Sequence, residues 1–242
     1  MRIPENIYQK WTLNRIHMDW AVMAAQDYRI EDPSVWSEAL SFSRQMMRRA
    51  GSELEQIIDR LVRDGYRFAA TETVLVRPES NVEEWVKHYR QKGVYIPVVL
   101  EAWLMEVGSV NLIGSHPDWS RPGYIFEDGG MVDPLRTDAF VCEVNSSYVD
   151  YLYDEWESLD DIKKPPFRID ISPDYLHKAN ISGGPPYQID TRRSAVDALV
   201  LNERHCTSFV GLLRLALRWN GFPGFEEITG EGEWCNIRNN VI

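Results

Sequence analysis

The sequence predicts an α+β fold, and three observations lead to that class. Segments with helical periodicity dominate the chain up to residue 107, and mostly short extended segments follow, up to residue 202. One more helical segment then closes the pattern. Strands and helices do not alternate regularly, which disfavours a doubly wound parallel sheet. We therefore expect a mainly antiparallel, twisted sheet of about 4–6 strands packed by helices on one side.

The N-terminal region, residues 1–63, is expected to be helical and to dock on a main domain formed by residues 64–242. Apolar residues recur at helical spacing in three segments, which are 5–27, 35–50 and 52–64. The break before the second segment contains Pro33. Ser52 and Glu55 have the spacing of a capping box at the start of the third segment, and Gly65 is expected to end it.

Residues 66–76 alternate loosely and are expected to be extended, and residues 80–89 are expected to form a helix. The most informative block follows, at residues 96–119. Pro97 suits a first helical position, and Gly108 suits the left-handed residue just past a helix end. Between them, one apolar face is expected from Leu100, Trp103, Leu104 and Val107. Trp103 is therefore predicted to be buried against the sheet, and a strand is expected at 110–114.

The second half of the chain is predicted to form strands with one intervening helix. Residues 120–135 contain two prolines and three glycines, which is typical of a long loop. We expect a strand at 138–142, an acidic helix at 147–159 and extended structure at 167–174. A hairpin-like connection at 179–191, a short strand at 199–202 and a helix entered through residues 207–209 complete the prediction.

Composition limits the class of protein. The chain has 242 residues, of which 44% are hydrophobic and 26% are charged, as is usual for a globular protein. No stretch approaches the ~20 apolar residues of a membrane span. The N-terminus also lacks the apolar core of a secretory signal, so we expect a cytoplasmic location. The three cysteines fit neither a disulfide framework nor a zinc pattern, which predicts ordinary thiols.

Charge indicates what kind of partner to expect. The 26 basic and 37 acidic side chains give a net charge of −11, which argues against binding to a nucleic-acid backbone. Residues 143–161 hold seven of the acids and no Lys or Arg. Such a run is usually a solvated helix face. Large aromatic residues interleave with these acids, however, so a docking surface for a basic protein is the second interpretation.

Two groups of polar residues suggest chemistry. Ser115, His116 and Asp118 lie within one predicted turn, but the side chains of adjacent Ser and His residues diverge, so we interpret them as turn residues. A divalent metal site is the alternative, for which the candidate ligands are His116, Asp118, Asp174, His177, Asp190 and His205. No HExxH or CxxC spacing supports such a site, so we expect no metal and no cofactor. The glycine-rich stretch at 180–187 lacks the Lys and helix of a phosphate-binding loop and favours a hairpin.

Residues 64–219 resemble the SUKH superfamily, which comprises bacterial immunity proteins and related regulators of cell-wall synthesis. The resemblance rests on the Ile96–Pro97 step, the Val107–Gly108 helix end, the strand at 110–114 and the later segments at 167–174, 179–191, 199–202 and 207–209. It departs from that pattern in the longer N-terminal helical region and in an insertion at 120–165.

The resemblance implies an α+β fold and a non-enzymatic protein that neutralises a cognate toxin by covering it. The partner would then be a protein such as a basic toxin domain, and neither a nucleic acid nor a membrane. The predicted partner-binding residues lie in the acidic helix and are Tyr148, Asp150, Tyr151, Asp154, Glu155, Trp156 and Glu157. The alternative is a small hydrolase or metal-dependent enzyme that uses His116, His177 and His205.

Overall fold

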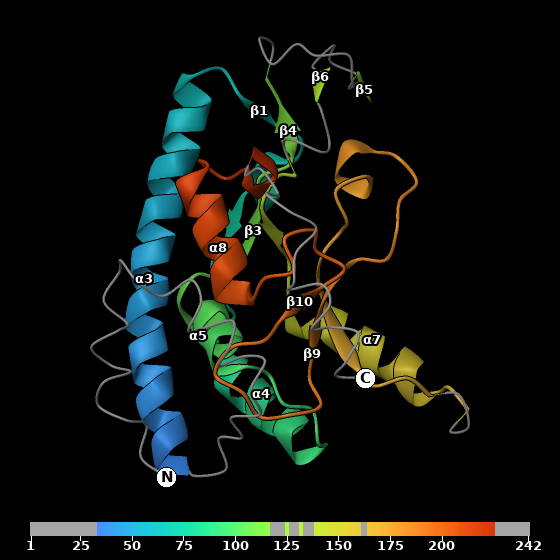
Figure 1. Ribbon diagram of the computed structural model, residues 1–242. Helices are drawn as coiled ribbons and strands as arrows, with labels where there is room; N and C mark the ends of the chain where they lie inside the picture. Colours follow the sequence, from blue (N-terminus) through green and yellow to red (C-terminus); the bar gives the residue numbers. More distant parts are fainter. Residues whose placement is uncertain (1–32, 117–123, 126–130, 133–137, 161–163, 226–242) are drawn as a thin grey trace.

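The computed structural model describes residues 33–116, 124–125, 131–132, 138–160 and 164–225, and it confirms the α+β class. The α-helices in these ranges are α3 (Pro33–Arg63), α4 (Val82–Gln91), α5 (Val98–Glu106), α7 (Ser146–Glu157) and α8 (Phe209–Arg218). Helices α3, α5 and α8 gather on one side of the strands, whereas α7 lies on the other side (Figure 1). The prediction of helices on one side is therefore right for three of these helices and wrong for α7.

Every strand pair is antiparallel, as predicted. The first three-stranded sheet has the order β2 (Leu75–Val76), β3 (Ser109–Asn111) and β7 (Val141–Cys142). The second has the order β10 (Val200–Leu201), β9 (Tyr187–Asp190) and β8 (Arg168–Ser172). The N–H of Glu143 donates to the carbonyl of Ile171 at 2.9 Å, which links the two sheets. Two small pairs stand apart, β1 (Arg67–Phe68) with β4 (Gly114–Ser115) and β5 (Tyr124–Ile125) with β6 (Met131–Val132).

Helix α5 forms the centre of the core. Gly108 has φ +91°, and the N–H groups of Val107 and Gly108 both donate to the carbonyl of Trp103, at 2.8 and 3.0 Å. This is the left-handed helix end that the sequence predicts. Trp103 is fully buried, as predicted. Pro97 is extended and precedes the helix instead of opening it. The expectation of a single apolar face is wrong, because every residue from 98 to 104 is buried among α3, α4, α8 and the strands.

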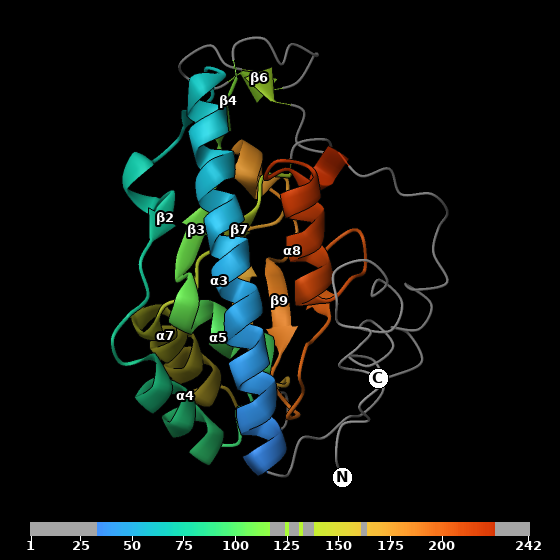
Figure 2. The ribbon, with the colours of Figure 1, turned by 90° about the vertical axis from the view of Figure 1, so that its left-hand side faces the viewer.

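Helix α3 is one continuous helix of 31 residues, which corrects the prediction of two helices separated near Gly51. Gly51 lies inside the helix, and a Cβ placed there would lie 3.3 Å from Cγ2 of Val107. The glycine therefore allows close packing of α3 on the end of α5. Figure 2 shows α3 running in front of the strands over most of the length of the molecule. Side chains of α3 such as Leu54 and Ile57 belong to the same hydrophobic cluster as α5 and α8.

Other predicted elements are shorter or interrupted. Residues 66–76 form β1 and β2 with a 3-10 turn, η1 (Thr71–Thr73), between them. The strand predicted at 110–114 is divided between β3 and β4, and the strand at 138–142 is reduced to β7. The helix predicted at 80–89 is α4. The helix predicted at 5–27 and most of the loop at 120–135 lie outside the described residues.

The later predictions agree more closely with the structure. Extended residues 167–174 contain β8, which pairs with β9 across the predicted hairpin-like connection. The strand at 199–202 is β10. Ser208 caps α8 by accepting a hydrogen bond from the N–H of Gly211, at 3.2 Å. Cys206 is disulfide-bonded and Cys142 is a free, buried thiol, so the expectation of three ordinary thiols is wrong for Cys206. Within the described ranges, no helix has the length and apolar character needed to cross a bilayer.

Candidate functional site

The acidic helix predicted at 147–159 is α7, and it is anchored from behind. The side-chain oxygen of Asn145 accepts from the N–H of Tyr148 at 2.9 Å and caps the helix. Val149 and Tyr153 are buried, and the ring of Tyr153 makes an edge contact with Tyr89 on α4, at a centroid distance of 5.3 Å. The opposite side of α7 is thereby held toward solvent.

Six of the seven predicted partner-binding residues are exposed on this helix. We call them the acidic face of α7: Tyr148, Asp150, Tyr151, Asp154, Glu155 and Glu157. The seventh, Trp156, is half-buried, and its ring packs against Tyr153 and Phe167 with centroid distances of 5.4 and 5.5 Å. Its indole N–H donates to the carbonyl of Pro165. Trp156 thus belongs to the packing that supports α7 and is not part of the face that α7 presents.

The carboxylates of the acidic face of α7 contact no basic side chain among the described residues. Asp150 accepts from the hydroxyl of Tyr89 at 2.6 Å, and Glu155 accepts from the hydroxyl of Tyr151. Lys164 donates at 3.1 Å to the main-chain carbonyl of Glu157 and leaves the carboxylate free. Within the described part of the chain, no Lys, Arg or His side chain forms an ion pair with any of the four acids.

A cleft of about 750 Å³ lies beside the N-terminal end of α7, and we call it the α7 cleft. The end of β2, the junction between β7 and α7, strand β8 and the 3-10 turn η3 (His177–Ala179) form its walls. Charged and aromatic residues from all of these segments and from α4 line it, namely Arg77, Glu79, Trp85, Glu143, Tyr148, Asp170 and His177.

Two half-buried carboxylates in the α7 cleft have only neutral hydrogen-bond donors within the described part of the chain. Glu143 accepts from the side-chain amide of Asn111 at 3.0 Å. Asp170 accepts from the side-chain amide of Gln188 at 2.7 Å and from the hydroxyl of Tyr148 at 3.4 Å. Burial raises the pKa of Asp170 above its ordinary value, because removal of water penalises the charged form.

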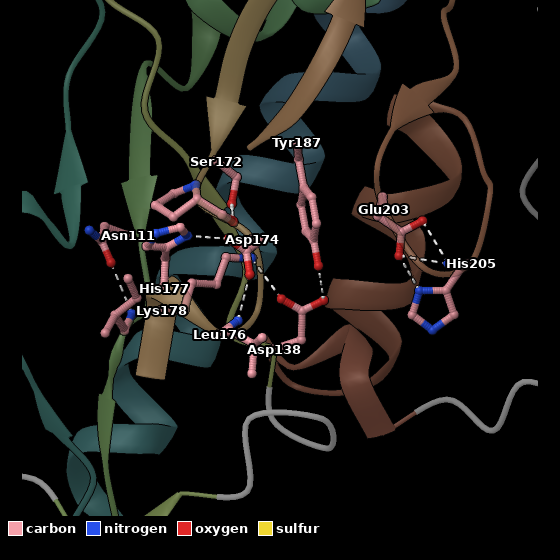
Figure 3. A network of polar contacts seen from close by, with 12 residues as sticks. Asn111, Asp138, Ser172, Asp174, Leu176, His177, Lys178, Tyr187, Glu203 and His205 are labelled. Carbon is pink, nitrogen blue, oxygen red and sulfur yellow. Dashed lines mark hydrogen bonds and ion pairs between the residues drawn. The ribbon is translucent and has the colours of Figure 1, made fainter. Parts of the chain in front are cut away.

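An Asp–His pair borders the same cleft. Nδ1 of His177 contacts the carboxylate of Asp174, which also accepts from the N–H of Leu176 at 2.9 Å (Figure 3). Burial alone would raise the pKa of Asp174, but the hydrogen bonds from His177 and Leu176 outweigh it and hold the pKa below its ordinary value. The imidazole of His177 is half exposed.

The histidines named as alternative ligands do not share partners. Nε2 of His116 lies 2.7 Å from the carbonyl of Asp64, whereas His205 contacts the carboxylate of Glu203. In Figure 3, Asp138 and Tyr187 lie between His177 and His205. Of the three histidines, only His177 lines the α7 cleft. Asp190 binds Arg192, and Asp118 lies outside the described residues. Among the residues with described positions, no three His, Cys, Asp or Glu side chains gather as metal ligands.

Glu143 and Asp170, which form the floor of the cleft, were not among the site residues predicted from the sequence, although part of the signal was present. In β8, Asp170 lies between Ile169 and Ile171, which are both buried, so strand alternation places Asp170 on the opposite face. Glu143 follows the buried Cys142 in the same way. The pairing that brings β7 beside β8 has no local signature, so the two carboxylates could not be joined into one site from the sequence.

No family model, curated protein or solved structure matches this chain.

Proposed function

We propose that this chain is a non-enzymatic protein-binding module that docks on a basic surface of a partner protein through the acidic face of α7. The observation that carries this proposal is that four carboxylates stand exposed on a rigidly anchored helix, and none forms an ion pair with a described residue. The two exposed tyrosines supply rigid contact area beside that charge. Aromatic anchors next to complementary charge are typical of protein interfaces.

The resemblance to SUKH immunity proteins supports the same kind of function. A protein that neutralises a basic toxin domain by covering it would need a fixed surface of opposite charge. The acids would mainly accelerate association, and the tyrosines would mainly slow dissociation. Trp156, which packs against Tyr153 and Phe167, is assigned a structural role in this proposal.

The test is a kinetic comparison of two triple variants. The first reverses Asp154, Glu155 and Glu157 to Lys. The second is a matched control with the same change in net charge, in which the exposed residues Glu53, Asp59 and Glu72 become Lys. The partner is recovered by affinity capture from the source cell, and its association rate is measured across a range of salt concentrations.

We expect the first triple variant to associate at least ~10-fold more slowly at low salt and to lose most of its salt dependence. The control should retain most of the wild-type rate. If both variants associate equally slowly, overall charge matters and the acidic face of α7 has no special role.

One observation favours the alternative of a small hydrolase: the Asp174–His177 pair has the arrangement of an oriented general base and borders the α7 cleft. Since His116 and His205 have separate partners, such an enzyme would have to work through His177. If the chain is a binding module, it should not hydrolyse ester or phosphoester substrates. Hydrolysis by the wild-type chain that is lost in His177→Gln would favour the enzyme instead. A binding module should also hold no stoichiometric metal when purified without chelators, and about one metal per chain by elemental analysis would favour the enzyme.

A further inference from the structure

We propose that the α7 cleft receives one arginine side chain from the docked partner. This inference rests on the proposed function and names the chemistry of its central contact. The acidic face of α7 would attract a basic surface in general. The cleft, whose wall includes Tyr148 of that face, would select one guanidinium on it.

Two carboxylates on the floor of the cleft lack a cationic partner among the described residues. Glu143 and Asp170 are both half-buried, and their hydrogen-bond donors are the neutral side chains of Asn111, Gln188 and Tyr148. A carboxylate that is partly withdrawn from water is stabilised by a cationic partner. No described Lys, Arg or His side chain forms an ion pair with either of them.

The basic residues that border the cleft are engaged elsewhere. Arg77 points its guanidinium at Glu55 on α3, with Nη2 3.1 Å from Oε1. His177 is held through Nδ1 by Asp174. Neither therefore neutralises the floor, and a cation that satisfies Glu143 and Asp170 would come from outside the described chain.

Trp85 on α4 lines the same cleft and has an unsatisfied polar group. Its side chain is more than nine-tenths buried, with 8% exposure, and its indole Nε1 has no hydrogen-bond acceptor among the described residues. A buried N–H without an acceptor is costly, and a metal or ammonium ion could not satisfy it. A peptide carries carbonyl acceptors as well as side chains, so an arginine borne on a peptide segment supplies the missing cation, and its carbonyl groups offer an acceptor to Nε1 once the indole turns out of its buried position.

Arginine suits this site better than lysine. Its planar guanidinium offers several donors in a fixed arrangement, and it also stacks on aromatic rings. The cleft offers two carboxylates beside the ring of Tyr148, and its volume of about 750 Å³ leaves room for a long side chain. A lysine ammonium would act as a point charge and gain less from this combination.

The experiment uses the full chain and three blocked tripeptides, acetyl-Gly-Xaa-Gly-amide, in which Xaa is arginine, lysine or citrulline. Citrulline keeps the shape of arginine and removes its charge. Binding is followed by the ¹⁵N–¹H resonance of the Trp85 indole, which is assigned with Trp85→Phe. We expect the arginine peptide to bind ~10-fold or more tightly than the citrulline peptide and to shift the Trp85 resonance.

Substitutions inside and outside the cleft test where the arginine peptide binds. Asp170→Asn and Glu143→Gln should each weaken binding of the arginine peptide ~5-fold or more, whereas Asp59→Asn, at an exposed position on α3 away from the cleft, should leave it unchanged. Equal binding of the arginine and citrulline peptides by wild-type protein would overturn the proposal without any variant. Binding of the lysine peptide as tightly as the arginine peptide would overturn it too. So would binding of the arginine peptide that leaves the Trp85 indole resonance unshifted.

The two proposals can fail separately. If reversal of Asp154, Glu155 and Glu157 to Lys leaves partner association unchanged while the arginine peptide still binds the cleft, the proposed docking face is wrong and the cleft stands. If the reversal slows association but the protein binds the arginine and citrulline peptides equally well, the docking face stands and the cleft proposal is wrong.

Discussion

At the scale of single residues, Trp103 joins three parts of the fold. Its ring makes edge contacts with Phe140 and Phe209, both at a centroid distance of 5.7 Å, and so connects α5 to the segment before β7 and to α8. We expect Trp103→Ala to lower the free energy of unfolding by ~3–5 kcal/mol, the range for removal of a large core aromatic. Chemical denaturation measures this, and Tyr151→Ala, at a side chain 55% exposed, should change it by less than ~1 kcal/mol. Equal effects of the two substitutions would place Trp103 outside the core.

Gly108 and Gly93 provide a matched pair for separating two costs of adding a methyl group. Both have positive φ, +91° and +81°. A Cβ at Gly108 would lie 2.2 Å from the carbonyl oxygen of Val76, whereas a Cβ at Gly93 would meet nothing within 4 Å. Gly93→Ala should therefore cost only the ~1–2 kcal/mol of left-handed strain, and Gly108→Ala should cost clearly more, because strand β2 must move. Similar losses in thermal or chemical denaturation would show that β2 yields without cost.

At the scale of elements, the contact between α4 and α5 contains a titrating group. Glu101 is buried in α5, and Arg90 on α4 lies 3.3 Å from its carboxylate. Burial raises the pKa of Glu101 from 4.5 to about 7, and the attraction of Arg90 opposes the shift only in part. A carboxyl group whose pKa is raised on folding contributes stability below its unfolded-state pKa. That contribution is lost as the pH rises through the folded-state pKa.

The resulting prediction concerns Glu101→Gln. Because the variant removes this titration, it should become more stable relative to wild type as the pH rises from about 5 to about 8. Glu106→Gln is the control. Burial tends to raise the pKa of Glu106, but hydrogen bonds from Arg48 and Arg44 outweigh this and lower it, so its titration lies below that window. The control should therefore differ from wild type by a constant amount. A constant difference for Glu101→Gln would contradict the prediction.

The elements also show what the sequence could and could not reveal. The end of α5 at Gly108 and the cap of α8 at Ser208 depend on neighbouring residues, and both were predictable. The continuity of α3 through Gly51 depends on contact with Val107, which is remote in sequence, so local propensity gave the wrong answer. For the site, the run of acids interleaved with aromatic residues predicted the exposed acidic helix face. The cleft could not be predicted, because Glu143 and Asp170 line one cleft only through the packing of β7 beside β8.

At the scale of the whole molecule, the described residues share one large hydrophobic cluster. It includes Leu54 of α3, Trp103 of α5, Ile169 of β8 and Phe209 of α8. A smaller cluster at the start of α3, around Trp36, packs on Val98 of α5. The boundary expected at residue 63 therefore runs through the core, and α3 should not unfold by itself.

This makes a prediction about cooperativity. Leu54→Ala removes a fully buried side chain from α3 and should cost ~2–5 kcal/mol, whereas Val62→Ala, at a side chain 57% exposed on the same helix, should cost less than ~1 kcal/mol. If α3 belongs to the common core, the loss in Leu54→Ala will lower the protection of slowly exchanging amides in α8 as much as in α3. Native-state hydrogen exchange measures both helices in one sample. Lower protection confined to α3, with α8 unchanged, would mean that α3 opens independently and that the N-terminal region is a docked subdomain after all.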